Sequence, residues 1–134
     1  MDSAPPPDPN RLGVAVARLS SAVRRTGKSS LLAAAVLLEA GETVECAAAG
    51  RLEGDPAVAV LTDRRLLLVN ERAWAPLVAI LAVDANLTVQ GWQDSRTASL
   101  TFIAAGRQHV LEQITDKPLA VEVAGRIRAR NGTG

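Results

Sequence analysis

The spacing of apolar residues changes twice along the chain, from a helical period to a period of two and back again. In the first part, apolar side chains recur every three or four residues, which predicts an amphipathic helix over 8–28. Asp8 suits the N-cap of this helix and Pro9 suits its first turn. The apolar positions of the helix are Leu12, Val16, Leu19 and Val23.

A second helix is predicted directly after the first. Ser29 and Ser30 are start signals, Gly41 is a stop signal, and residues 31–39 between them are apolar on nearly every side. A helix with this composition is typical of a buried position. We therefore expect one or two helices before the first strand, the second of them inside the core.

Beyond Glu42 the apolar residues alternate or form short runs, as they do in β-strands. Thr62–Arg65 has the composition of a tight hairpin turn, and Trp74–Pro76 marks a sheet edge or the beginning of a strand. Residues 84–86 are compatible with a break between two strands or with a bend in one long strand, so six or seven strands are expected. The predicted strands are 44–52, 58–61, 66–70, 77–83, 86–92, 98–104 and 108–114.

The helical period returns after Ile114. Thr115 or Asp116 caps a predicted helix that has Pro118 in its first turn and an apolar stripe along one side. The stripe consists of Leu119, Ala120, Val123, Ala124 and Ile127. Antiparallel strands joined by short connections curl into two nearly orthogonal halves, and one amphipathic helix fits the open corner. The predicted fold class is therefore α+β, mainly β: a bent antiparallel barrel or sandwich capped by a C-terminal helix.

The composition supports one domain that folds without disulfide bonds. The chain has 134 residues, 48% of them hydrophobic, and Cys46 is its only cysteine. The longest apolar run, 31–38, is far shorter than the roughly 20 residues that a membrane-spanning helix needs. The first residues are rich in proline and lack the basic and apolar segments of a secretion signal. We expect a reduced, cytoplasmic protein.

This pattern predicts four segments. Residues 1–7 are a disordered Pro-rich tail, 8–28 the N-terminal amphipathic helix, 29–130 the barrel domain and 131–134 a second disordered tail.

The charge distribution and the small number of aromatic residues argue against nucleic acid as a partner. The net charge is +1, but residues 1–30 contain five bases and two acids whereas residues 31–115 contain six bases and ten acids. One Phe, two Trp and no Tyr leave few planar side chains on which bases can stack. An acidic central region also repels a phosphate backbone.

No set of residues has the spacing of a catalytic or metal site. Thr26–Ser29 is similar to the end of a phosphate-binding loop, but Ala22 stands where that pattern requires glycine, and a helix rather than a strand is predicted before it. His109 is the only histidine and is predicted to be an ordinary strand residue. We therefore expect a non-enzymatic protein without metal, cofactor or small-molecule substrate.

Three stretches resemble the bacterial pleckstrin-homology (PH)-like domain family, of the YokE-like type. They are Leu38–Val44, Val60–Val69, and Pro76-Leu77 with Ile80 and Val83. In that family a leucine, a small residue and Gly-Glu precede the first strand, and a Leu-Thr-Asp-x-Arg-Leu hairpin joins the second and third strands. The resemblance covers about 31–130 and implies a PH-like fold that binds without catalysis. The loop 51–55 has one base and two acids, so phosphoinositide recognition is not expected.

Two functions compete on this basis. The first is a scaffold for protein–protein interaction or homo-oligomeric assembly, and the alternative is a peripheral membrane module that binds anionic lipid through the basic N-terminal helix. The apolar side of that helix can pack on its own barrel, on another copy or on a membrane. At the hairpin, Arg64 and Arg65 form a pair of adjacent bases. One of them can bond to Asp63 or Glu71, or both can contact an anionic partner. The candidate interaction surface is Leu12, Val16, Leu19, Val23, Arg24, Arg25, Arg64 and Arg65.

Overall fold

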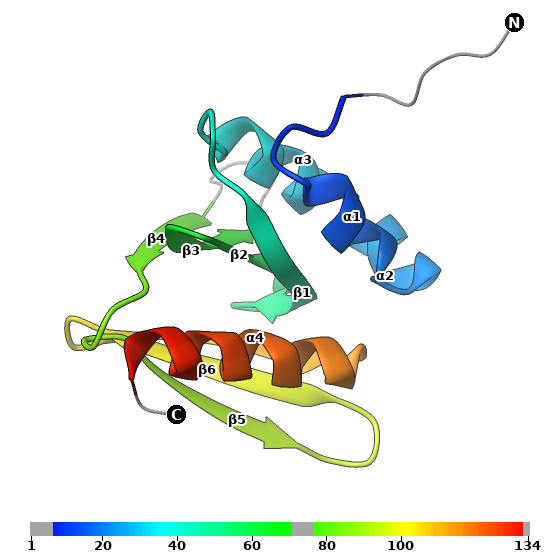
Figure 1. The fold of residues 1–134 in the computed structure, drawn as a ribbon. Coiled ribbons are helices and arrows are strands. Elements are labelled where there is room, and N and C mark those ends of the chain that lie inside the picture. The colour runs from blue at the N-terminus through cyan, green and yellow to red at the C-terminus, as the bar shows by residue number, and fades with distance from the viewer. Residues whose placement is uncertain (1–6, 71–76, 133–134) are drawn as a thin grey trace, which may run out of the picture.

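A computed structural model describes residues 7–70 and 77–132 and contains four helices and seven strands within them (Figure 1). Three short helices come first and a long helix comes last, with all the strands between them. The helices are α1 (Leu12–Ala17), α2 (Ser21–Thr26), α3 (Lys28–Leu37) and α4 (Lys117–Asn131). The strands are β1 (Val44–Leu52), β2 (Asp55–Thr62), β3 (Arg65–Asn70), β4 (Leu77–Ala82), β5 (Thr88–Gln93), β6 (Ala98–Ala104) and β7 (Arg107–Ile114).

The strands form one antiparallel sheet in the order β4-β3-β2-β1-β7-β6-β5. The sheet bends where β1 passes from one half to the other, because β1 pairs with β2 along its whole length but with β7 only at Arg51 and Leu52. Figure 1 shows α4 in the angle between the halves and α1 to α3 on the outer side of β1–β3. The predicted fold class, α+β and mainly β, with a bent antiparallel sheet capped by a C-terminal helix, is confirmed, and seven strands is the correct alternative.

Gly50 makes the bend in β1 possible. At this residue the backbone carbonyl of Glu112 on β7 approaches so closely that a Cβ atom would overlap with its oxygen. A side chain at this position would therefore separate the two halves of the sheet where they join.

The core extends to both faces of β3, as the continuous leucine run predicts. The four residues Leu66–Val69 are at most 1% exposed. Helix α3 packs on the outer face of β2 and β3, while Val123 and Ile127 of α4 are completely buried on the inner side with Phe102. The strand prediction at 66–70 was therefore correct in both position and environment.

The prediction of one continuous helix over 8–28 was wrong. Helix α1 begins only at Leu12, because the Asp8 carboxylate accepts the N–H of Gly13 at 3.0 Å and Arg11 adopts a left-handed conformation with φ 61°. The helix then stops at Ala17, and Ser20 is extended before α2 begins. The chain thus has three helices before β1 instead of one or two.

Two further helix predictions need correction. Helix α3 is not buried on all sides: Leu32 is 60% and Val36 85% exposed, because α3 lies on the outside of the sheet and can bury only one side. Helix α4 continues to Asn131, inside the segment 131–134 expected to be disordered, and the Asn131 side chain donates to the Leu87 carbonyl at 2.6 Å. The strand edge predicted at Trp74–Pro76 lies outside the described residues.

Replacing Gly50 by alanine should destabilise the domain strongly. The added Cβ overlaps with a backbone oxygen that cannot move without separating β1 from β7, so we expect Gly50→Ala to lose more than about 3 kcal/mol of unfolding free energy in urea titrations. Gly125→Ala is the matched control. No atom lies within 4 Å of a Cβ at this exposed helical position, and it should gain up to about 1 kcal/mol. Equal midpoints for Gly50→Ala and the wild type would contradict the bend argument.

Candidate interaction surface

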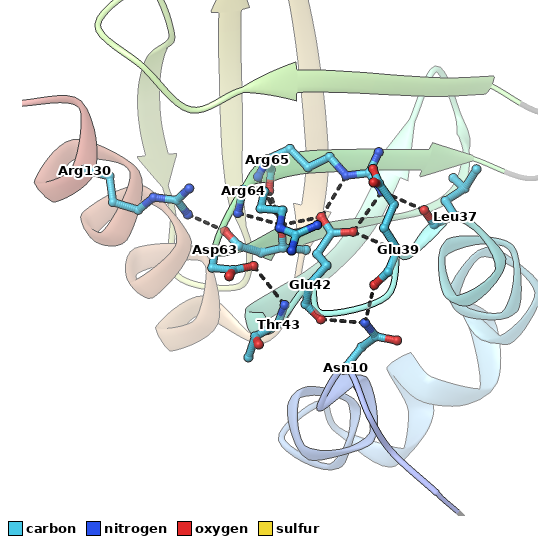
Figure 2. A network of polar contacts seen from close by, with 10 residues as sticks. Asn10, Leu37, Glu39, Glu42, Thr43, Asp63, Arg64, Arg65 and Arg130 are labelled. Atoms are coloured by element: carbon cyan, nitrogen blue, oxygen red, sulfur yellow. Dashed lines mark hydrogen bonds and ion pairs between the residues drawn. The ribbon is translucent and has the colours of Figure 1, made fainter.

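A buried ion pair between Glu42 and Arg65 lies where the helical segment meets the sheet (Figure 2). Glu42 is 0% exposed, and its carboxylate accepts Arg65 Nε at 2.8 Å and Nη2 at 2.9 Å. Thr62 Oγ1 donates to the same carboxylate at 2.7 Å, and the Glu39 N–H donates at 3.0 Å. Four donors thus satisfy a charge that would otherwise be very costly to bury.

The hydrogen bonds from Arg65 hold the pKa of Glu42 at about 2, well below its ordinary value of 4.5. The Glu39 N–H and the Thr62 hydroxyl act in the same direction, while burial opposes them. Glu42 is therefore ionised at neutral pH. The site is a structural charge pair rather than a proton donor or acceptor.

The same network attaches the N-terminal helices to the sheet. Asn10 Nδ2 donates to the carbonyls of Glu39 at 2.9 Å and Glu42 at 2.5 Å, and its own carbonyl accepts the N–H of Val44 in β1. Arg65 also donates to the Leu37 carbonyl at the end of α3, at 2.6 Å. The start of α1, the end of α3 and the β2–β3 hairpin therefore meet at one buried pair.

A second set of contacts joins α1 and the turn after it to α4. Arg18 forms a bidentate ion pair with Glu122, and the Ser20 N–H donates to the Asp116 carboxylate at 3.0 Å. The bonds from Arg18 lower the pKa of Glu122 to about 2. Leu19 between them is only 2% exposed. The N-terminal helices thus pack on their own barrel.

The structure divides the eight residues of the predicted interaction surface. Leu19 lies in the core, and Leu12, Val16 and Val23 are half-buried against it. The exposed residues of the set are Arg24, Arg25 and Arg64. Arg65 bonds to Glu42 and, at 3.4 Å, to Glu39, rather than to Asp63. The expected alternative partner, Glu71, lies outside the described residues.

Three members of the predicted set meet at a groove between α1 and α3. The groove has a volume of about 420 Å³ and an apolar floor that includes Leu12, Val16 and Leu31. Arg24 and Lys28 lie at its rim together with Asp8 and the exposed Leu32. Val23 instead faces a separate hollow between α2 and β1.

The prediction missed the exposed apolar residues of α3 and β4. Leu32 and Val36 were predicted to lie in a buried helix. They are four residues apart and therefore share one side of the helix, while the opposite side is also apolar, so only one of the two sides can be buried against the sheet. In β4, Val78 is 45% and Ile80 53% exposed. Strict alternation of burial along β4 marks a strand with one solvent face.

The register places the exposed β4 residues on the same side of the sheet as α3. Ile80 lies opposite Leu67 and Ala82 lies opposite Arg65, and directly paired residues point to the same face. Because Arg65 reaches the end of α3, the side chains of Val78 and Ile80 also point to the outer side. Among the described strands, none pairs with the far edge of β4.

The other candidate chemistry is inert or dispersed. Burial raises the pKa of the Cys46 thiol to about 12, so it is protonated and unreactive. His109 lies on strand β7, as predicted, and is half-buried. Thr26–Ser29 spans the junction of two helices: Thr26 ends α2, Gly27 forms the turn, and Lys28 and Ser29 begin α3. Within residues 7–70 and 77–132, no three His, Cys, Asp or Glu side chains are grouped to hold a metal ion.

None of the helices in the described part of the chain combines the length and apolar character required to span a bilayer.

Comparison with known proteins identifies similar folds only. No protein-family model matches the sequence, and no curated protein matches it. A PH domain from Shewanella amazonensis SB2B is 17% identical, with 76% of this chain and 96% of that chain covered at a TM-score of 0.49. A DUF1696-family protein with a PH domain from Shewanella loihica PV-4 is 13% identical, with 77% and 90% covered at the same TM-score. Function has to be inferred from the residues of this chain.

Removing the charge of Glu42 should destabilise the protein and alter its response to acid. Glu42→Gln leaves the half-buried Arg65 with only the more distant Glu39, at 3.4 Å, as an anion, so we expect a loss of about 3 kcal/mol at neutral pH in urea titrations. Because the pKa of Glu42 is depressed in the folded state, its stabilising effect is complete above its unfolded pKa near 4.5 and disappears as the pH falls through about 2. The variant should therefore lose less stability than the wild type across this window.

Glu112→Gln is the control for this experiment, because Glu112 is exposed on β7. It should change the unfolding free energy by less than about 0.5 kcal/mol. Some acid sensitivity should persist in Glu42→Gln because Glu122, also with a pKa of about 2, titrates in the same window. If Glu42→Gln behaves like Glu112→Gln, the buried pair does not stabilise the fold.

Proposed function

We propose that this protein is a non-catalytic binding and scaffold module that assembles with other protein chains, in the first place with copies of itself. The observation that carries the proposal is the far edge of β4, with which none of the other described strands pairs. Its sequence, Leu-Val-Ala-Ile-Leu-Ala, has no charge and no proline, and it pairs with β3 over six residues without a bulge. Soluble proteins normally protect an edge strand with one of these devices.

The sequence of β4 is well suited to pair with itself. Two copies can pair in antiparallel fashion about a two-fold axis that passes between their Ala79 residues. Val78 of each copy then lies opposite Ile80 of the other. These side chains are half-exposed in the single chain and would contact each other across the pair. No like charges would face each other, because β4 carries none.

Several further features belong to the same proposal. The chain is a cytoplasmic, non-enzymatic member of the bacterial PH-like family of the YokE-like type. Residues 29–130 are the PH-like unit, and residues 8–28 fold onto it. The protein binds neither nucleic acid nor a small-molecule substrate. In support, the residues of the resemblance have folding roles here. Gly41 has a φ of 81° before β1, and Glu42, Thr62 and Arg65 form the buried network at the β2–β3 hairpin.

Light scattering coupled to size exclusion tests the assembly. At micromolar concentration the intact chain should have the mass of a dimer or a larger oligomer. Val78→Lys should reduce this to the mass of one chain, because a lysine opposite Ile80 has no acidic partner in the strand pair. The N-terminal helices should be kept, since Ala15, Leu19 and Leu31 belong to the core and their removal would uncover the residues of the sheet on which they pack.

Val121→Lys is the matched control. Val121 is 60% exposed on α4, so the substitution makes the same chemical change away from β4 and should leave the mass unaltered. A monomeric wild type would end the self-assembly proposal in favour of a different protein partner. An oligomer that Val78→Lys does not dissociate would remove β4 from the interface.

A further inference from the structure

The N-terminal helices carry a charge opposite to that of the barrel. Within the described residues, 7–37 contain five bases and one acid, whereas 38–70 and 77–132 contain nine bases and eleven acids. Arg18 is neutralised by Glu122, but Arg11, Arg24, Arg25 and Lys28 are exposed. The molecule therefore has a basic end, made of α1 to α3, and a mildly acidic body.

The basic end also presents apolar side chains to solvent. Along the outer side of α3, Lys28, Leu32, Ala35 and Val36 follow one another at helical spacing, and all are exposed. Leu32 and Val36 are the most exposed large aliphatic residues of this helix. Arg24 and Lys28 lie at the rim of the groove that Leu32 also lines, so cations and aliphatic groups occupy one site.

We propose that this surface, consisting of Arg24, Lys28, Leu32, Ala35 and Val36, binds an anionic membrane surface. Leu32 and Val36 enter the boundary between headgroups and acyl chains, and Arg24 and Lys28 remain at the level of the phosphates because their long stems reach past the apolar groups. Arg11 and Arg25 add attraction at longer range. The contact is made by the folded helices and is independent of the β4 edge.

The charges around the site favour lipid over a protein segment. Two acidic groups lie close by: Asp8 accepts the N–H of Gly13, and Glu39, beyond the end of α3, pairs with Arg65. The other bases are spread along the segment: Arg11 precedes α1, Arg24 and Arg25 lie on α2, and Lys28 begins α3. A fluid layer of anionic headgroups can accommodate such a spread, because lipids rearrange under the protein.

The test is flotation of the intact protein with vesicles of equal parts phosphatidylcholine and phosphatidylglycerol, beside vesicles of phosphatidylcholine alone. Binding to the anionic vesicles should be strong at low salt and weak at high salt, with little binding to the neutral ones. The pair Arg24→Gln and Lys28→Gln should weaken it about 25-fold, since each base contributes roughly a factor of five. The pair Leu32→Ser and Val36→Ser should weaken it by about ten-fold or more.

The control pair is Arg96→Gln and Arg107→Gln, which removes the same charge from exposed positions beside β6. Its binding should stay within about two-fold of the wild type, if local contact rather than net charge decides the affinity. Equal binding to neutral and anionic vesicles, an equal effect of the two charge pairs, or full binding by the serine variants would each overturn the proposal. Absence of binding to either vesicle would also overturn it and leave the groove to an acidic segment of another protein. Because the β4 variants test other residues, failure of either proposal leaves the other intact.

Discussion

The arrangement of the N-terminal half depends on the burial of one carboxylate. Glu42 has no contact with water, so its charge requires Arg65, Thr62 and a backbone N–H in fixed positions. Those partners come from the β2–β3 hairpin and the end of α3. Asn10, just before α1, donates a hydrogen bond to the Glu39 carbonyl of the same segment. The carboxylate is satisfied only when the hairpin and the segment after α3 are both in place, and Asn10 bonds to the backbone of that same segment, which makes the helices part of the domain rather than a separate arm.

The sheet depends on a second constraint, the close approach of β7 to Gly50. Seven strands in a flat sheet would leave one broad face uncovered, and the bend at β1 lets α4 cover both halves from inside. The outer face then needs its own cover. Helix α3 supplies it over β2 and β3, its main contacts in the sheet, and β4 lies beyond them. The exposed residues of β4 are thus a consequence of how little surface one ten-residue helix can cover.

The sequence predicted the strands well because alternation and turn residues are local signals. Thr62–Arg65 forms its turn through bonds to the Thr62 hydroxyl, and Asp116 lies at the N-cap position of α4, both as expected. The Asp116 carboxylate, however, accepts the Ser20 N–H and makes no capping bond to the helix. The break between α1 and α2 is not local, because it depends on contacts of Arg18 and Ser20 with α4, about a hundred positions away. The same holds for the candidate surface. Helical spacing identified Leu12 and Val16, but only the fold decides that Leu19 is buried and that Leu32 and Val36 are not.

The two exposed apolar regions have one physical origin and different chemistry. Both exist because α3 buries a single side: its opposite side carries Leu32 and Val36, and beyond it lie Val78 and Ile80. The first region is bordered by Arg24 and Lys28, and hydrated cations beside aliphatic groups resist burial against another dry surface. The second has no charge within β4 and offers free backbone groups, which lipid cannot satisfy but another strand can. The difference in neighbouring charge is therefore what directs one surface toward anionic headgroups and the other toward protein.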